Sequence, residues 1–143
     1  MTFDPFTTAL EGEESIRVVG KAALPMNGMG ASIQTTEHSY ALMIHMSEAL
    51  GVNCTFCHNT RAFSQWPEST PQRVTAWHGI RMTRDLNLNY LDLLKASFPP
   101  NRLGPHGDAP KLNCGTCHIG VNKPLYGVSM AKDYPELGGT PAP

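Results

Sequence analysis

The sequence predicts a mostly α-helical fold in which a helix and a connecting loop lead twice to a Cys-x-x-Cys-His motif. The motif occurs at residues 54–58 and again at 114–118. A segment with helical periodicity and helical end signals precedes each occurrence, which makes the helix–loop–motif unit a weak internal repeat. A chain of 143 residues has the length of a single domain.

The first part of the chain differs in composition from the rest. Residues 1–34 are rich in glycine, proline and short polar side chains, so we expect an extended N-terminal arm. Within it, residues 16–19 look strand-like and residues 25–30 are expected to turn. Residues 35–143 form the predicted domain that carries both motifs. No segment has the roughly 20 consecutive apolar residues of a membrane-spanning helix.

The first helix is predicted to begin at a threonine cap, Thr35 or Thr36, and to end at Leu50. Gly51 follows as the glycine that terminates the helix in a left-handed conformation. Its predicted apolar stripe consists of Tyr40, Met43, Met46 or Ser47, and Leu50. The first motif comes directly after this helix, so the end of the helix sets the position of the motif.

The second helix has a strong start signal, because Thr70 is a good cap and Pro71 suits the first helical position. It is predicted to run to about Ala96. The residues predicted to lie on adjoining stripes of this helix are Val74, Trp77, Arg81, Asp85, Leu88 and Leu91.

Loops are expected to dominate the remainder of the chain. Phe-Pro-Pro at residues 98–100 stops the second helix. A loop rich in glycine and proline, residues 101–113, leads to the second motif. The tail at 119–143 is predicted to be mostly loop, with one helical turn near 129–132.

Cys-x-x-Cys-His is the attachment signature of a covalently bound c-type haem. The two thiols add to the haem vinyl groups as thioethers, and the adjacent histidine directs its imidazole at the iron. The composition gives roughly 0.005 chance matches in this chain, so two chance matches are not expected. The fold prediction is therefore a small multihaem c-type cytochrome organised around two haem c groups. These are attached at Cys54, Cys57, Cys114 and Cys117, with His58 and His118 as proximal iron ligands.

A zinc site with four thiolate ligands is the rival interpretation of the two cysteine pairs. The pairs are much farther apart in sequence than those of a zinc ribbon. Zinc also requires no histidine after each pair. Both observations favour haem.

The chemistry of haem attachment indicates where the protein is located, and the net charge indicates which partners it binds. Covalent haem attachment takes place outside the cytoplasm, so we expect a periplasmic or extracellular protein. Residues 1–5 lack the basic and apolar regions of a leader, so we expect a leader to be removed or replaced, or export to be arranged differently. A formal charge of −1 gives no reason to expect nucleic acid as a partner.

The sixth iron ligands set the chemistry, because methionine opposite histidine raises the potential and a second histidine lowers it. Met43, His45 and Met46 are the candidates for the first haem. Met43 is favoured, because the helix rises about 10 Å from there to Leu50, comparable with the span of a porphyrin. The alternative is that these methionines only fill the core.

The second haem is not built by simple repetition. The offset that places Met43 before Cys54 places Leu103 before Cys114, and leucine cannot bind iron. The candidates for the sixth position of the second iron are His78, Met82, His106, His38, His45, a partner chain or no ligand.

All of the arginines between the two motifs are candidate partners for haem propionates, because guanidinium suits a carboxylate better than ammonium does. Arg73, one turn after Thr70, is the favoured one. A positive charge there would raise the haem potential. The alternative is an ordinary solvated helix charge.

Several segments resemble one known family. They are 40–43, 50–59, 69–73, 79–82, 84–87, 101–105 and 132–137, and residues 4–6 and 16–18 resemble the connector that precedes them. The family is the tetrahaem cytochrome c subunit of purple bacterial photosynthetic reaction centres. The resemblance is to its C-terminal half and covers nearly all of the chain.

The resemblance implies a periplasmic protein at the outer face of the inner membrane, bound to the reaction-centre core subunits. Such proteins re-reduce the photo-oxidised bacteriochlorophyll pair, and take electrons from a soluble carrier such as cytochrome c2 or a high-potential iron–sulfur protein. It also implies that Met43 binds the first iron and that Arg73 lies near that haem.

The chain departs from the family by covering one half of its length. In the family, the last haem takes its sixth ligand from a histidine in the other half. We therefore expect a second chain, as in a homodimer or with a second cytochrome, a local residue such as His78 or Met82, or a five-coordinate iron at His118.

The predicted function is electron transfer without catalysis, with a reaction-centre special pair as acceptor. One alternative is a free-standing electron shuttle or a subunit of a multihaem assembly. Another is a small haem enzyme or gas sensor that uses an open second iron. The chain shows no obvious distal acid–base pair for such an enzyme.

Overall fold

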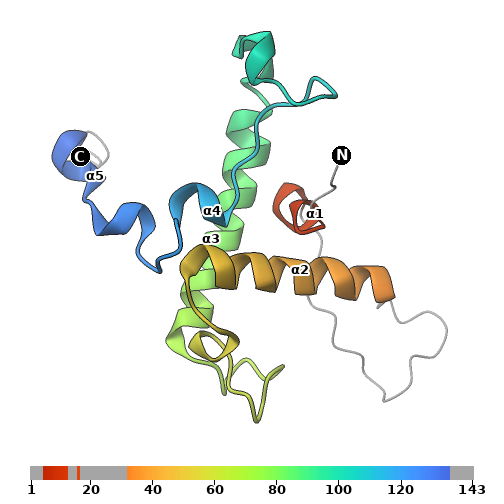
Figure 1. Cartoon of the computed structure of the whole chain (residues 1–143), viewed down its shortest axis with the longest axis vertical. Helices are drawn as coiled ribbons and strands as arrows, with labels where there is room; N and C mark the ends of the chain where they lie inside the picture. The colour runs from red at the N-terminus through yellow and green to blue at the C-terminus, as the bar shows by residue number, and fades with distance from the viewer. Residues whose placement is uncertain (1–4, 13–15, 17–31, 136–143) are drawn as a thin grey trace, which may run out of the picture.

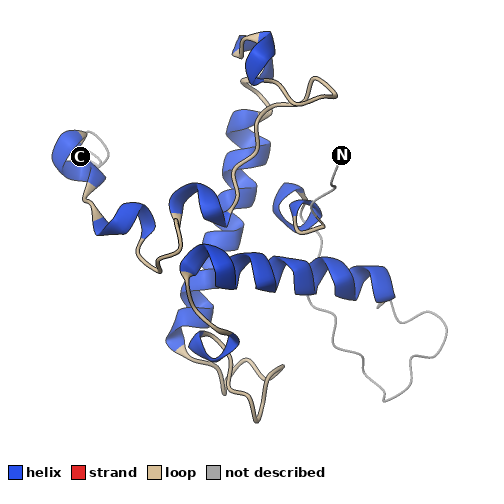
Figure 2. Ribbon diagram, in the orientation of Figure 1, coloured by secondary structure: helices blue, strands red, loops and turns tan. Residues whose placement is uncertain are grey.

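The computed structural model describes residues 5–12, 16 and 32–135, which are shown in colour in Figure 1. Helices and loops make up these residues, and no strand occurs among them (Figure 2). This confirms the prediction of a mostly α-helical fold. The turn expected at 25–30 lies outside the described residues, as does the strand-like patch at 16–19 apart from Ile16.

Helix α2, Ile33–Leu50, begins three or four residues earlier than predicted, because its cap is Ser32 and not Thr35 or Thr36. The Ser32 hydroxyl accepts a hydrogen bond from the Thr35 backbone N–H at 3.0 Å, and the Thr35 hydroxyl lies 3.4 Å from the Ser32 N–H as its acceptor. Thr35 therefore closes a capping box instead of being the cap. Gly51 ends the helix at φ 63° and ψ 36°, as predicted.

The buried face of α2 is rotated from the predicted stripe. Leu42 is fully buried, whereas Tyr40 is 66% exposed. Met43 and Met46 are half-buried and pack against the core. The buried positions are Ser39, Leu42 and Ala49. This face is selected by the helix that packs on it, which the periodicity of α2 alone does not reveal.

That packing partner is α1, Thr7–Glu11, a short helix where the sequence predicted extended chain. Leu10 of α1 is 1% exposed and forms the core with Ala9, Leu42 and Ile80. A helix this short is unstable alone, so its conformation depends on this burial. α1 packs against both α2 and the next long helix. The division of the chain at residue 35 stays a prediction.

Helix α3, Pro71–Asp85, begins as predicted, with extended Thr70 before it and proline at its first position. The Thr70 hydroxyl does not cap the helix. It donates to the Phe56 carbonyl at 2.6 Å, next to the first motif. After Asp85 the helix widens into the π-helix η2, Leu86–Leu91, and ends before the predicted Ala96.

The face of α3 and η2 that meets α1 also differs from the predicted stripes. Its buried positions are Ile80, Thr83 and Asn87. Of the predicted stripes, Trp77 packs against the core, while Val74 is 43% exposed. Two polar side chains hold α1 here, because Arg84 Nε donates to the Ala9 carbonyl at 2.7 Å and Asn87 Nδ2 to the Leu10 carbonyl at 3.0 Å.

The remaining elements are short. The second motif is itself a helical turn, α4, that packs against α2. In Figure 1, α5 lies at the side of the molecule, away from α2 and α3, and it confirms the helical turn predicted near 129–132. The elements are η1 Cys54–Phe56, η3 Lys95–Ser97, η4 Pro100–Arg102, α4 Cys114–Cys117, η5 Pro124–Gly127 and α5 Met130–Asp133.

The chain beyond the second motif touches the end of α2. The Gly120 N–H donates to the Ala49 carbonyl at 2.9 Å. A side chain at Gly51 would place its Cβ 2.1 Å from the Gly120 carbonyl oxygen. Gly51 is therefore required both for its left-handed backbone and for this close approach.

Replacing Gly51 with alanine should lower the free energy of unfolding by about 2 kcal/mol or more, because left-handed strain and the clash with Gly120 add. Gly79→Ala is the matched control. Gly79 lies inside α3 and a Cβ there meets nothing within 4 Å, so this change should be neutral or stabilising. Urea denaturation measures both. Equal stability of the two variants would contradict the tight contact at Gly51.

Candidate haem-binding sites

The first motif forms a single turn directly after α2. Asn53 precedes it, and its Oδ1 accepts hydrogen bonds from the Thr55 N–H at 3.1 Å and the Thr55 hydroxyl at 2.5 Å. The His58 N–H donates to the Cys54 carbonyl at 2.9 Å. Residues three and four apart in such a turn share a face, so both cysteines and the histidine belong to one side of it.

The imidazole of His58 is fixed by the backbone that follows. Its Nδ1 lies 3.0 Å from the Phe63 carbonyl oxygen, and its ring stacks on the Phe63 ring with centroids 4.2 Å apart. A carbonyl oxygen only accepts, so Nδ1 carries the proton. Nε2 is then the ring nitrogen with a lone pair for a metal, and such second contacts are typical of histidine ligands.

The second motif repeats this arrangement in α4. The His118 N–H donates to the Cys114 carbonyl at 2.9 Å, the same bond and length as in the first motif. The Nδ1 of His118 lies 3.2 Å from the Val121 carbonyl oxygen, which again leaves Nε2 for iron. Two sites separated in sequence therefore orient their histidines in the same way.

Burial affects the pKa of one cysteine in each motif. Burial raises the pKa of the Cys114 thiol to about 11. Burial also raises the pKa of Cys57, and the guanidinium of Arg73 partly opposes this shift. Among the described residues, which include all four cysteines, no three His, Cys, Asp or Glu side chains are grouped to hold a metal ion.

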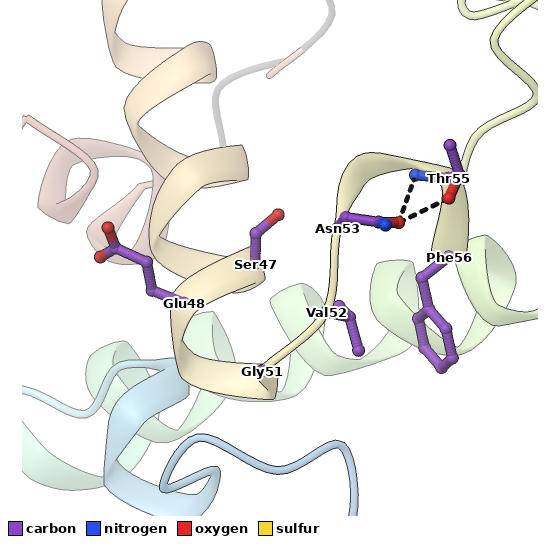
Figure 3. A pocket seen from close by; sticks show the side chains of 7 residues that line it. All are labelled: Ser47, Glu48, Gly51, Val52, Asn53, Thr55 and Phe56. Atoms are coloured by element: carbon purple, nitrogen blue, oxygen red, sulfur yellow. Dashed lines mark hydrogen bonds between the residues drawn. The ribbon is translucent and has the colours of Figure 1, made fainter.

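A cleft of about 810 Å³ opens where α2 meets the first motif. Figure 3 shows Asn53 and Thr55 of the motif segment on one side and Ser47 and Glu48 of α2 on the other. Its volume lies within the range of cofactor sites in proteins. The cleft borders the first motif, and Cys54, Cys57 and His58 are not among the residues that line it. The lining residues are Ser47, Glu48, Gly51, Val52, Asn53, Thr55 and Phe56.

The candidate sixth ligands of the first haem lie on α2 with different surroundings. Met43 is half-buried against the core. This packing is the role that was considered as the alternative to iron binding. His45 stacks on Phe6, with ring centroids 3.9 Å apart, and its Cε1 lies 3.8 Å from where a Cβ on Gly115 would be. His45 is therefore next to the second motif. Iron binding by Met43 stays a prediction.

The other candidates for the second iron are spread over the described surface. His78 and Met82 are exposed on α3, with Met82 56% exposed. His106 is exposed in the loop before α4, and His38 is half-buried in the first part of α2. The sixth position of the second iron stays open among these candidates.

Arg73 belongs to the surroundings of the first motif. Its Nη1 donates to the Gln65 carbonyl at 3.2 Å and to the Phe63 carbonyl at 3.5 Å, and its guanidinium lies 5.0 Å from the centre of the Trp66 ring. The Phe63 carbonyl is the one that holds His58. Arg73 therefore supports the loop that orients His58, and its contact with a propionate stays a prediction.

The sequence analysis did not identify some of the residues that support the two haem motifs. An asparagine precedes each motif, at Asn53 and Asn113, and this repetition in the sequence could have indicated them. The Asn113 N–H donates to the Thr116 hydroxyl at 3.1 Å, so each asparagine segment bonds to a threonine within its motif. The carbonyl partners of the two histidines lie at different spacings, and no sequence pattern indicates them.

Comparison with known proteins places this geometry in a family. Residues 1–138 match the family model described as the photosynthetic reaction centre cytochrome C subunit. The chain belongs to this family. This confirms the predicted resemblance and a c-type cytochrome with covalently bound haem c. Among the described residues, no helix is long and apolar enough to cross a membrane.

Three relatives illustrate the extent of the match. The chain is 56% identical over 142 residues to the photosynthetic reaction center cytochrome c subunit of Rubrivivax gelatinosus, covering 99% of this chain and 39% of the relative. It is 51% identical to that of Thermochromatium tepidum, covering 96% and 34%. A cytochrome c-554 of Chloroflexus aurantiacus is 30% identical over 101 residues, covering 69% and 22%. The chain thus spans less than half the length of these relatives.

Replacing Arg73 with glutamine should lower the midpoint potential of the first haem by about 40 mV. Removing one half-buried positive charge, worth about 1 kcal/mol, stabilises the oxidised iron. Arg61→Gln is the matched control, because Arg61 is exposed in the same loop and its charge is screened. A redox titration followed in the visible haem bands measures both. Equal shifts in the two variants would contradict a specific role of Arg73.

Proposed function

We propose that this chain binds two haem c groups and passes electrons to the oxidised bacteriochlorophyll pair of a photosynthetic reaction centre. The observation that carries the proposal is the repeated geometry of the motifs. In each, the histidine N–H bonds to the first cysteine carbonyl and the ring Nδ1 bonds to a backbone carbonyl. Family membership supports the same conclusion, because the relatives are cytochrome subunits of reaction centres. They are electron-transfer proteins and not enzymes.

A haem iron accepts and releases one electron without binding a substrate. The protein therefore contributes attachment, orientation and electrostatics. Cys54 and Cys57 hold one haem and Cys114 and Cys117 the other. Backbone carbonyls keep the proton of each proximal histidine on Nδ1, so that Nε2 faces iron in one tautomer. Arg73 keeps a positive charge beside the first motif, which favours the reduced state there.

The axial ligands complete the proposal. Met43 is the proposed sixth ligand of the first iron, because it lies on α2 directly before the first motif and a thioether raises the potential. The second iron takes a ligand from a partner chain, from a local residue such as His78 or Met82, or remains five-coordinate. Low-temperature EPR of the oxidised protein at two concentrations separates these three cases by spin state and by concentration dependence.

The proposed setting is the periplasmic side of the inner membrane, on the reaction-centre core subunits. A soluble carrier such as cytochrome c2 or a high-potential iron–sulfur protein is the proposed donor. Assembly of two such chains, or of this chain with a second cytochrome, would supply a ligand to the second iron. The comparisons give no support to a free-standing shuttle or to a haem enzyme, since the reaction-centre relatives match nearly the whole chain.

The protein should contain two haems per chain in a pyridine haemochrome assay. Cys114→Ala combined with Cys117→Ala should leave one, because each motif attaches its haem independently through its own thiols. Substitution of Cys54 and Cys57 is the matched control and should also leave one haem. A single haem in the unmodified protein, or loss of both haems from either variant, would contradict two separate attachment sites.

The reduced protein should accelerate the re-reduction of the photo-oxidised bacteriochlorophyll pair in reaction centres without a bound cytochrome. Flash-induced absorbance changes measure this rate. The same protein oxidised in advance is the control, because it has no electron to give. An unchanged rate with the reduced, two-haem protein would contradict the proposed acceptor while leaving haem binding intact.

A further inference from the structure

We infer that Asn87 is a positioning residue for the second haem, because its side chain fixes the backbone that enters the second motif. The inference rests on the proposed function in one respect, namely that Cys114, Cys117 and His118 hold a haem. Asn87 lies in η2, just beyond the end of α3. It is a polar side chain with no exposed surface.

The carboxamide of Asn87 is bonded on both sides. Its Nδ2 donates to the Leu112 carbonyl at 2.9 Å and to the Leu10 carbonyl at 3.0 Å. Its Oδ1 accepts a hydrogen bond from the Leu112 N–H at 2.7 Å. Leu112 therefore has both of its backbone polar groups bonded to one side chain. Two bonds to one residue fix both its position and the direction of its peptide planes.

The fixed residue is close to the haem attachment. Leu112 lies two residues before Cys114, so their Cα atoms are at most about 7 Å apart. The segment after the motif is held separately, where the Gly120 N–H bonds to the Ala49 carbonyl. The second motif is thus held at its entrance by Asn87 and at its exit by α2. A change at Asn87 releases the entrance and the bond to Leu10 of α1, while the bond at the exit is kept.

Asn87 is the second residue of the π-helix η2. The Asp92 N–H bonds to the Asn87 carbonyl five residues earlier, at 3.1 Å. π-turns of this kind are often found at functional sites. The neighbouring polar side chain, Asn89, is exposed, and its Nδ2 donates to Asp85 Oδ1 at 2.7 Å. Asn87 alone of the two reaches the motif segment.

Release of Leu112 should alter the second haem and not the first. The entrance to the first motif is α2, and the Thr70 hydroxyl at the other end of α3 donates to the Phe56 carbonyl within that motif. A haem potential depends on ligand geometry and solvent exposure. Movement of Cys114 and α4 therefore changes the potential of the second haem, while the first keeps its own.

The test compares Asn87→Leu and Asn87→Asp with Leu42→Ala in the haem-loaded protein. Asn87→Leu removes all three hydrogen bonds and keeps the branched shape of the side chain, and Asn87→Asp keeps its size and removes the two donors. Leu42→Ala is the stability control, because Leu42 is fully buried in the core and makes no hydrogen bond to the second motif through its side chain. The readouts are the midpoint potential and EPR spectrum of each haem, and hydrogen exchange of the Leu112 amide. The haem absent from the Cys114/Cys117 variant identifies the second haem.

Both Asn87 variants should change the reduction equilibrium constant of the second haem at least threefold, which is about 28 mV at 59 mV per tenfold. They should also speed exchange of the Leu112 amide and leave the first haem unchanged. Leu42→Ala should not change the reduction equilibrium of the second haem selectively. Selective loss of the second haem from an Asn87 variant supports the same conclusion.

Three results would overturn the inference. They are unchanged second-haem properties in both Asn87 variants, an equal effect of Leu42→Ala, and fast exchange of the Leu112 amide in the unmodified protein. The haem count of the unmodified protein keeps the two proposals apart. If that count is below two, the proposed function fails, whereas the exchange of the Leu112 amide still tests the contact with Asn87.

Discussion

Helix α3 sets the separation of the two haem motifs, because a polar side chain at each of its ends bonds to backbone beside one motif. The Thr70 hydroxyl donates to the Phe56 carbonyl within the first motif. Asn87, beyond the other end, holds Leu112 just before the second. The 17 residues between Thr70 and Asn87 correspond to about 25 Å of helix. On the opposite side, the close approach of Gly51 to Gly120 joins the end of α2 to the exit of the second motif.

Buried polar groups do much of this positioning because the polypeptide core is small. Among the described residues, the fully buried large side chains are Leu10, Leu42 and Asn87. The asparagine directs its hydrogen bonds at the backbone of Leu10 and Leu112. A satisfied buried polar group selects one arrangement of its partners, because any other leaves a desolvated donor or acceptor unpaired. Apolar packing of this small extent would define the positions of α1 and α4 less uniquely.

The same use of backbone carbonyls appears at the proximal histidines. Phe63 and Val121 each accept from an imidazole Nδ1, although they follow their histidines at different spacings. The first of these carbonyls is shared with Arg73, so charge and ligand orientation are coupled in one loop. The residues of this loop therefore influence the electron affinity of the first haem site. Electron affinity is the property that an electron-transfer protein of this family must control.

The sequence by itself determined the chemistry and the local elements. Each haem motif is contiguous, and the Thr70-Pro71 start and the Gly51 stop are local signals, so no distant contact was needed to predict them. The helix face that is buried, the short helix α1 and the role of Asn87 were decided by tertiary structure. Leu42 and Asn87 are buried because α1 packs on both α2 and α3, and α1 is helical because Leu10 is buried there. Such mutual dependence between segments far apart in the chain leaves no periodic pattern in any one of them.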